Sequence, residues 1–379
     1  MGPLHGLKVI EIGSIGPGPM CAMLLADLGA TVLRIDRKEA SGLGVPRPAK
    51  FDLVLRNRPA IPLDLKQPAS VAFVLDLVAR SDVLIEGFRP GVMERLGLGP
   101  DACLTRNAKL IYGRLTGWGQ TGPLANVVGH DINYIALTGA LHAIGRAGQA
   151  PAPPINLVGD FAGGSLYTAI GILAAIYEMK SSGRGQVIDA AMVDGVASLM
   201  TQPYGTFAAG MMSNQRGTNI TDSGAPFYDV YECADGKWVA LGAVEKKFYA
   251  EALRVLELDA LLEDQWNRTR WPDTRIRLAA KFKTRTRDEW SQLFDGTESC
   301  FAPVLTIDEA PQHPHLRARA TYVEIDGVVQ PAPAPRFSRS VPPAPQAASA
   351  WEDAGAEDIL GPWLNPSEVG AARNAGLVG

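Results

Sequence analysis

The first third of this 379-residue chain alternates short β-branched runs with helical patterns, and this alternation restricts the fold more than any other feature. The expected strands are continuously apolar, which is typical of strands buried on both faces. Apolar strands joined by helical crossovers form a parallel sheet covered by helices. Strands are expected at Leu7–Ile12, Thr31–Asp36, Ala60–Leu65, Val83–Glu86, Leu110–Leu115 and Gln186–Ala190. The sequence therefore predicts an α/β fold with a Rossmann-like domain.

Helical patterns lie between and after these strands. They predict helices at Pro19–Leu28, Ala69–Arg80, Val92–Leu96, Ile135–Ile144, Gly163–Met179 and Asp194–Ala209. The longest apolar run, Gly163–Tyr177, is 15 residues. This is shorter than the ~20 residues that a membrane-spanning helix needs, so we expect a buried helix there.

The pattern changes near Asn214. Ala225–Val244 contains aromatic and β-branched residues around an Asp-Gly pair, which is a strong hairpin signal. Two amphipathic helices are expected after it, within a smaller α+β domain. Six prolines between residues 331 and 345 exclude a helix or a central strand, and they indicate a stiff extended connector.

The formal charge of −4 gives no reason to expect nucleic acid or a membrane surface as a partner. However, the segment from Arg34 to Arg114 has 14 Lys/Arg and nine Asp/Glu, a local charge of +5. A basic segment in an acidic protein favours a small anionic ligand. The four cysteines are scattered without metal-ligand spacing, which indicates no zinc, no disulfide framework and a reducing compartment.

A glycine-rich loop, Gly13–Gly18, follows the first expected strand and opens a helix, and Asp36 ends the second strand. This arrangement is similar to a dinucleotide-binding turn. However, the spacing is GxxGxG instead of GxGxxG. Pro17 and Pro19 also lack the backbone N–H groups that a pyrophosphate needs. We interpret the loop as a tight strand-to-helix turn without dinucleotide binding.

Three cations follow the ends of neighbouring expected strands: Arg37, Lys66 and Arg89. Ligands of open α/β sheets bind outside the carboxyl ends of the strands, so these side chains are expected to converge on phosphates. The alternative is that they are independent surface charges.

Two residues are candidates for acid–base chemistry. His130 follows a Gly/Pro-containing loop and opens an expected helix, whose N-terminus lowers a histidine's pKa and offers N–H donors to an oxyanion. Asp160 precedes an apolar helix beside a run of small residues that leaves space for a ligand. The alternative for both is a capping role. His142 lies in an apolar run and is expected in the core.

The chain resembles the α-methylacyl-CoA racemases, a branch of the family III CoA-transferase superfamily, over nearly its whole length. The resemblance rests on the order and number of several segments: LKVIEIGSIGPGPMCAMLLADLGATVLRIDR, DVLIEGFRPGVMERLGLGP, LIYGRLTGWGQTGP, GHDINYIALTGALHAIGR, NLVGDFAGGS, GQVIDAAMVDG, YECADGKWVALGAVE and APRFSR.

The resemblance implies an interlocked homodimer in which a small domain is inserted into a large one. Carried over, the large Rossmann-like domain is expected at 1–195, completed by 346–379. A linker at 196–225, the small α+β domain at 226–325 and a Pro-rich return linker at 326–345 make up the rest. The active site is expected where one chain's large domain meets the other chain's small domain.

The resemblance also implies roles for residues. His130 and Asp160 match the catalytic acid/base pair, and Glu245 matches the acid that hydrogen-bonds the histidine. The matching CoA contacts are Arg37, Leu63, Asp64, Leu65, Lys66, Gly87, Phe88, Arg89, Arg95, Gly129, Asp131, Ile132, Asn133 and Tyr134.

These matches imply a racemase that interconverts (R)- and (S)-2-methylacyl-CoA thioesters without a metal or cofactor, CoA being part of the substrate. The acyl group is expected beside Met192, Met200, Met211 and Met212. A CoA-transferase that uses Asp160 as a nucleophile is the nearest alternative, and a silent CoA-binding protein is another. A cytoplasmic, bacterial enzyme without membrane or nucleic-acid partners is the simplest setting.

Overall fold

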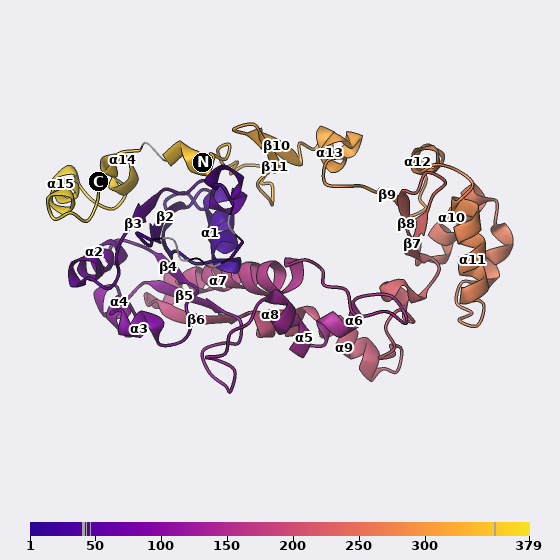
Figure 1. The fold of residues 1–379 in the computed structure, drawn as a ribbon, viewed down its shortest axis with the longest axis horizontal. Helices are drawn as coiled ribbons and strands as arrows, with labels where there is room; N and C mark the ends of the chain where they lie inside the picture. Colours follow the sequence, from indigo (N-terminus) through magenta and orange to yellow (C-terminus); the bar gives the residue numbers. More distant parts are fainter. Residues whose placement is uncertain (40–41, 43, 46, 352–353) are drawn as a thin grey trace. The chain divides into compact units, whose positions relative to one another are not determined.

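The computed structural model describes residues 1–39, 42, 44–45, 47–351 and 354–379 (Figure 1). The chain forms two compact units. The first unit consists of Met1–Thr138, Ile155–Leu199 and Ala320–Gly379. The second consists of Gly139–Pro154 and Met200–Arg319.

A six-stranded sheet in the order β3-β2-β1-β4-β5-β6 forms the centre of the first unit. All of its neighbouring strands are parallel. The strands are β1 (Lys8–Ile12), β2 (Thr31–Asp36), β3 (Ala60–Pro62), β4 (Val83–Glu86), β5 (Ile111–Thr116) and β6 (Gln186–Ala191). The predicted parallel α/β sheet is therefore confirmed.

Helices cover both faces of this sheet, as Figure 1 shows for α1 and α7 against α2 to α4. The helices of this unit are α1 (Pro17–Asp27), α2 (Pro68–Val78), α3 (Val92–Arg95), α4 (Pro100–Arg106), α5 (Asp131–Leu137), α7 (Tyr167–Ser182), α8 (Met192–Leu199), α14 (Ala356–Leu360) and α15 (Pro366–Asn374). Alternate residues of one strand point to opposite cores: Ile10 packs with α2 and the C-terminal helices, and Val9 packs with α1 and α7.

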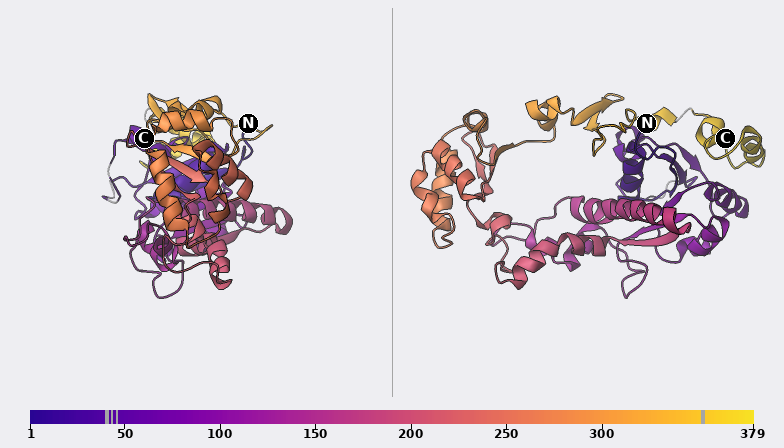
Figure 2. Two further views of the ribbon diagram at one scale, coloured as in Figure 1. Left: turned by 90° about the vertical axis from the view of Figure 1, so that its right-hand side faces the viewer. Right: turned by 180° about the vertical axis from the view of Figure 1, so that it is seen from behind.

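The last part of the chain is tied into the first unit by specific polar contacts. Trp363 Nε1 donates to Ser81 Oγ at 2.8 Å. Arg56 donates to Asp27 Oδ1 at 3.0 Å and also to Gln330 Oε1 at 3.0 Å. Gln330 belongs to the antiparallel pair β10 (Tyr322–Ile325) and β11 (Val328–Pro331). The contacts made by Trp363 and Gln330 join segments that are more than 250 residues apart in the sequence (Figure 2).

Two expected helices differ from the structure, and one further helix was not expected. The helix expected at 135–144 begins earlier, at Asp131, and ends before Gly139, whose φ of 81° starts α6 (Ala140–Ala143). The helix expected at 194–209 is divided at Met200 into α8 and α9 (Thr201–Ala208). Helix α4 was not expected, because its short sequence carries almost no apolar periodicity.

The helix expected to be buried at 163–177 is longer and more exposed. A π-helical segment, Leu157–Leu166, runs directly into α7, which makes 26 helical residues. By length and composition, this run is long and apolar enough to cross a membrane. The core helix of a globular domain meets the same criteria, and 39% of the most apolar window of this run is buried. One side of α7, with Thr168, Ile172 and Ala175, is buried against the sheet, and the rest faces outward.

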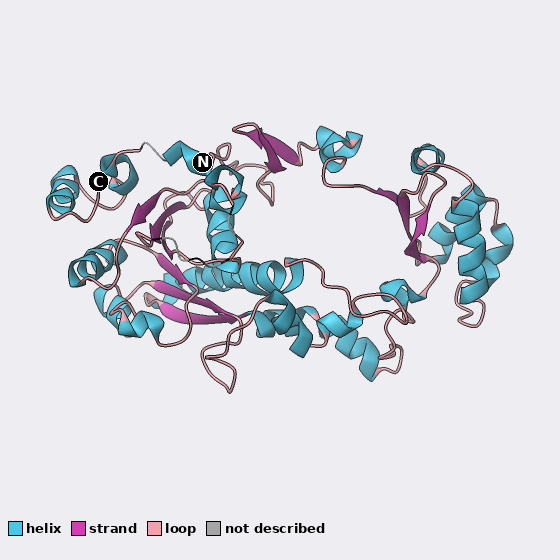
Figure 3. Cartoon of the chain, in the orientation of Figure 1, coloured by secondary structure: helices cyan, strands magenta, loops and turns pink. Residues whose placement is uncertain are grey.

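The second unit contains a three-stranded antiparallel sheet covered by helices (Figure 3). Its strands are β7 (Tyr228–Glu232), β8 (Trp238–Gly242) and β9 (Phe301–Val304), and the helices that follow the hairpin are α10 (Lys246–Leu256), α11 (Trp271–Phe282), α12 (Arg287–Phe294) and α13 (Pro314–Ala318). The predicted Asp-Gly hairpin is confirmed. Aromatic side chains fill the core, in which Phe282 packs against Tyr231 and Trp290.

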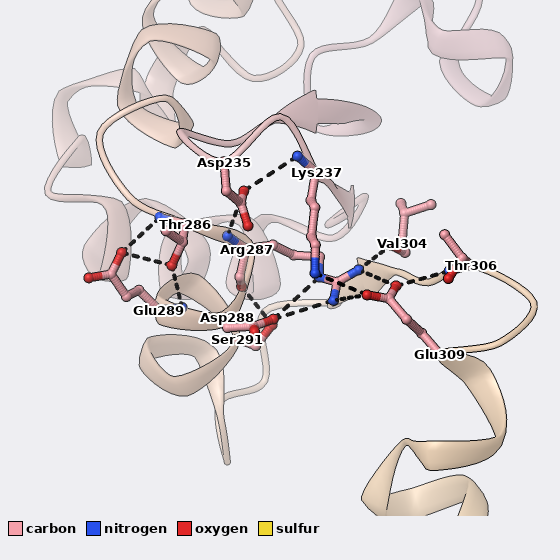
Figure 4. A network of polar contacts seen from close by, with 10 residues as sticks. All are labelled: Asp235, Lys237, Thr286, Arg287, Asp288, Glu289, Ser291, Val304, Thr306 and Glu309. Carbon is pink, nitrogen blue, oxygen red and sulfur yellow. Dashed lines mark hydrogen bonds and ion pairs between the residues drawn. The ribbon is translucent and has the colours of Figure 1, made fainter.

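A polar network holds the hairpin turn, the start of α12 and the loop after β9 together (Figure 4). Arg287 is only 5% exposed, and its guanidinium binds both carboxylate oxygens of Glu309, at 2.6 and 2.8 Å. The same guanidinium donates to the backbone oxygen of Val304 at 3.0 Å. These hydrogen bonds hold the pKa of the Glu309 carboxyl far below its usual range.

Candidate functional site

A cavity of about 520 Å³ lies at the carboxyl ends of β1, β2 and β3 in the first unit. Six of the residues expected to contact CoA line this cavity: Arg37, Leu63, Asp64, Leu65, Lys66 and Phe88. The Arg37 guanidinium lies over the Phe88 ring, 5.6 Å from its centroid. Asp64 accepts from the Lys66 backbone at 3.0 Å, which fixes the turn that follows β3.

The basic segment contains two kinds of cation. Several are paired, including Arg58 with Glu11 and Arg114 with Glu86, and these pairs are structural. In contrast, Arg37, Lys66, Arg89 and Arg95 are exposed and form no ion pair with any carboxylate of the described residues. Arg89 and Arg95 do not line the cavity, although they belong to the same side of the sheet, at and after the end of β4.

The glycine-rich turn connects this cavity to the candidate acid/base residues. Gly13 lines the cavity, and a Cβ placed on Gly16 would lie 3.3 Å from Asp160 Oδ2. Gly16 has a φ of 70° and caps α1, so its backbone requires glycine for conformation as well as for space. Asp36, the residue that a dinucleotide ribose would need, accepts from Arg34 Nε at 2.8 Å. This contact favours the interpretation of the loop as a structural turn.

Asp160 does not cap a helix, and that alternative is wrong. It lies inside the π-helical segment Leu157–Leu166, and Asn156 precedes that segment. Asn156 Nδ2 donates to Asp160 Oδ2 at 3.2 Å. Because π-helical turns are rare and often occur at functional sites, the backbone itself marks this position.

His130 is exposed and precedes α5, as predicted. Its backbone N–H donates to Asn133 Oδ1 at 3.0 Å, and its backbone oxygen accepts from the Asn133 N–H at 2.8 Å. The backbone of His130 therefore caps α5, as the alternative predicted. Its imidazole makes no capping hydrogen bond within the described residues.

Asp131 joins these two candidates. Its Oδ2 accepts from the backbone N–H groups of Gly159 and Asp160, at 2.7 and 2.8 Å. Asp131 is 6% exposed, and a Cβ on Gly159 would lie 2.5 Å from its Oδ2. One carboxylate thus attaches the first turn of α5 to the segment that carries Asp160.

The aromatic side chains beneath α5 are also closely packed. Tyr134 is 6% exposed, its hydroxyl donates to the Gly129 backbone, and its ring lies edge-on to Trp118 at 4.8 Å between centroids. Burial raises the pKa of Tyr134 to about 12. A Cβ on Gly117 would lie 2.1 Å from the same ring, so this glycine is required for packing.

The environment of Asp160 favours its protonated form. Burial raises the pKa of the Asp160 carboxyl most strongly, and the negative charge of Asp131 raises it further. The Asn156 hydrogen bond and the neighbouring His130 act in the opposite direction, and the net shift is upward. Asp160 is therefore suited to hold and release a proton nearer to neutral pH than an exposed aspartate.

Other predicted residues lie elsewhere. Glu245 is exposed and immediately precedes α10 in the second unit. Met200 and Met212 line a cavity of about 480 Å³ in that unit, whereas Met192 is buried in the first unit and Met211 is exposed. His142 was expected in the core because of its apolar neighbours, and this prediction is wrong. Its side chain is exposed and lines the same cavity as Met200. No group of three or more metal-ligating side chains occurs among the residues described.

Two contacts of the site were missed in the sequence: the Asn156–Asp160 hydrogen bond and the attachment of Asp131 to the Asp160 backbone. The four-residue spacing between Asn156 and Asp160 is a helical signal. It was missed because the helix was predicted from the apolar run that begins at Gly163, after both residues. The second contact is long-range, and no local pattern encodes it.

Known proteins resemble this chain in sequence and in fold. The model of "CoA-transferase family III" matches residues 4–352. The chain belongs to this family. It is 45% identical to the alpha-methylacyl-CoA racemase of Mus musculus (91% of this chain, 88% of that protein) and 44% identical to that of Homo sapiens (88% and 86%). A solved CAIB/BAIF family protein from Brucella suis superimposes with a TM-score of 0.78 at 25% identity, covering 99% of both chains.

Proposed function

We propose that this member of CoA-transferase family III is a racemase that interconverts (R)- and (S)-2-methylacyl-CoA thioesters. The identity of 45% to a protein named alpha-methylacyl-CoA racemase supports this activity. The observation that carries it is the joint placement of His130 and Asp160, which Asp131 links directly. His130 is exposed, whereas Asp160 is half-buried and burial raises the pKa of its carboxyl.

Racemisation next to a thioester removes a proton from one face of the α-carbon and delivers another to the opposite face. In the proposed mechanism, neutral His130 takes the proton of the (S) substrate, and protonated Asp160 gives a proton that forms the (R) product. The reverse reaction uses imidazolium and carboxylate. A carboxyl whose pKa is raised can alternate between these two forms during turnover.

The intermediate is an enolate, and its oxygen needs hydrogen-bond donors. The first backbone N–H groups of a helix have no partner inside the helix, and α5 begins directly after His130. These groups are proposed to donate to the enolate oxygen, which is usually a large part of the catalytic effect. Glu245 is proposed to orient the imidazole, a role that rests on the family resemblance.

The CoA portion is proposed to lie in the 520 Å³ cavity of the first unit, with Arg37 and Lys66 on its phosphates. The Phe88 side chain supplies an apolar and aromatic wall for the adenine. Arg89 and Arg95 add positive charge at this side of the sheet. In this reaction CoA is part of the substrate, and we propose that no separate cofactor takes part.

Incubation of the purified protein with pure (S)-2-methylacyl-CoA in deuterated water tests the proposal. Racemase activity gives exchange of the α-proton together with loss of optical purity. His130→Ala and Asp160→Ala should each abolish the loss of optical purity. If the wild-type protein catalyses neither change, but moves CoA to an added carboxylic acid, the racemase proposal is wrong.

The transferase alternative uses Asp160 as a nucleophile that forms an anhydride with the acyl group. Such enzymes usually lack a histidine at the position of His130. They carry a glycine-rich loop where this chain has residues 242–246. Here that segment includes the end of β8 and Glu245 at the start of α10, with a single glycine. These differences favour the racemase.

We also propose that the chain forms a homodimer. The outer face of α7 exposes Ile170 by 61% and Tyr177 by 78%, and β6, with Val187 40% exposed, is an edge strand. A long apolar face of this kind is typical of an interface. Light scattering after size exclusion should give twice the chain mass, and Ile170→Glu should shift the measured mass toward that of the monomer.

A cytoplasmic location remains a prediction, and the mouse and human relatives do not support a bacterial origin.

A further inference from the structure

The carboxylate of Asp131 has an unusual environment for a residue expected only to contact CoA. It is 6% exposed and turned into the protein, where its Oδ2 accepts from two backbone N–H groups. Its Oδ1 is buried and has no hydrogen-bond donor among the described residues. A buried carboxylate oxygen without a donor is costly, so this charge is retained for a reason other than packing.

The two N–H groups belong to Gly159 and Asp160, in the π-helical segment. The bonds are short, at 2.7 and 2.8 Å, as expected when the acceptor is charged. Gly159 is needed for this approach, because a Cβ there would lie 2.5 Å from Asp131 Oδ2. The position of the Asp160 backbone is thus defined by the residue that follows His130.

We propose that Asp131 is a positioning residue that fixes the Asp160 backbone and places a second negative charge beside the Asp160 carboxylate. The inference rests on the proposed function and deepens it. One side chain then sets both the distance between the two acid/base groups and the proton affinity of one of them. It touches no reacting atom.

The charge effect can be separated from the other groups that face Asp160. These are His130 just before α5, Tyr134 within α5, Asn156 just before the π-helical segment and the Gly16 backbone from the turn before α1. Of these, His130 and Asn156 lower the pKa of Asp160, whereas Asp131 raises it. Removal of the Asp131 charge therefore lowers the pKa of Asp160. With (R)-2-methylacyl-CoA, whose proton the ionised Asp160 takes in the proposed mechanism, the acid limb of the pH profile of kcat/KM then moves to lower pH.

Two variants divide the proposal into its parts. Asp131→Asn keeps an oxygen that can accept from both N–H groups but removes the charge, so the acid limb measured with the (R) substrate should move to lower pH. Asp131→Ala removes both, and kcat should fall about 10- to 100-fold with little change in KM, because an active group is displaced while CoA binding is retained. Asp82→Asn is the matched control. Asp82 also accepts a backbone N–H, from Lys8 at 2.8 Å, at the opposite end of the strands.

Two further measurements need no turnover. Carbon-13 titration of labelled aspartate, with the Asp160 signal identified by its loss in Asp160→Asn, should show a lower pKa in Asp131→Asn. Hydrogen exchange should show faster exchange of the Gly159 and Asp160 amides in Asp131→Ala. If wild-type protein does not racemise the substrate, the proposed function fails, and these measurements still decide on Asp131. The inference is overturned if the pKa of Asp160 in Asp131→Asn equals that in the wild-type protein. It is also overturned if the Gly159 and Asp160 amides of a folded Asp131→Ala exchange as slowly as those of the wild-type protein.

Discussion

Substitution of Gly16 by alanine tests whether the glycine-rich turn serves Asp160. Gly16 has a φ of 70°, where an L-residue costs about 1–2 kcal/mol. Its new methyl group would also lie 3.3 Å from Asp160 Oδ2, closer than an ordinary contact. The carboxylate must therefore move by a few tenths of an ångström, away from the position set by the 3.2 Å bond from Asn156.

The two effects are separated by a second glycine. Gly183 ends α7 with a φ of 73°, and a Cβ placed there meets nothing within 4 Å. Gly183→Ala should therefore lose roughly 1–2 kcal/mol of unfolding free energy without a change in kcat. Gly16 has a ψ of −115°, outside the left-handed helical region in which Gly183 lies, so Gly16→Ala should lose at least as much stability. In addition, its kcat should fall about 3- to 10-fold, since displacement by 1 Å can cost about 100-fold.

The assays are urea unfolding for stability and steady-state racemisation of (S)-2-methylacyl-CoA for kcat and KM. KM should change little in Gly16→Ala, because the carboxylate that moves is not among the residues of the CoA cavity. Equal kcat values for the two variants would refute the reasoning. They would show that the Asp160 carboxylate does not lie against this turn during catalysis.

Two other changes test the core and the CoA cavity. The Arg58 Nε lies 3.0 Å from the carboxylate of Glu11, which is wholly buried. Arg58→Met leaves this carboxylate without its partner, so it should lower the free energy of unfolding in urea by about 3–5 kcal/mol. The double change Arg58→Met with Glu11→Met should recover much of that loss; an equal loss in the double variant would contradict the argument. Lys66→Ala should raise KM for acyl-CoA about 10-fold, with an effect that shrinks at high salt. Lys109→Ala, at the other end of the strands just before β5, should leave KM unchanged.

The parts of the structure that follow from local periodicity were predicted well. All six strands of the parallel sheet were expected within a few residues. The central strands β1, β4 and β5 are buried on both faces and are therefore largely apolar runs. The hairpin at Asp235 and Gly236 followed from its turn chemistry. The errors fall where local signals are weak: α4 has little periodicity, and the helix expected at 194–209 breaks at Met200 within a continuous helical pattern.

The candidate site was predicted in its residues but not in its connections. Arg37 and Lys66 could be placed at one edge of the sheet because parallel strands present their carboxyl ends together. The π-helical segment and the bond from Asp131 to the Asp160 backbone could not be predicted in this way. The hydrogen bond joins residues that are 29 apart in the sequence, and neither it nor the π-helical segment leaves a periodic signature in the chain.

The environment of Asp160 also bears on the choice between the two activities of this family. A nucleophilic carboxylate must be ionised when it attacks, so an enzyme gains from groups that lower its pKa. Here burial and the charge of Asp131 raise the pKa instead, and only Asn156 and His130 oppose them. Such an environment weakens a nucleophile at neutral pH but suits a group that must be protonated in half of its turnovers. Together with the proposed role of His130 as the second proton carrier, it favours proton transfer over acyl transfer.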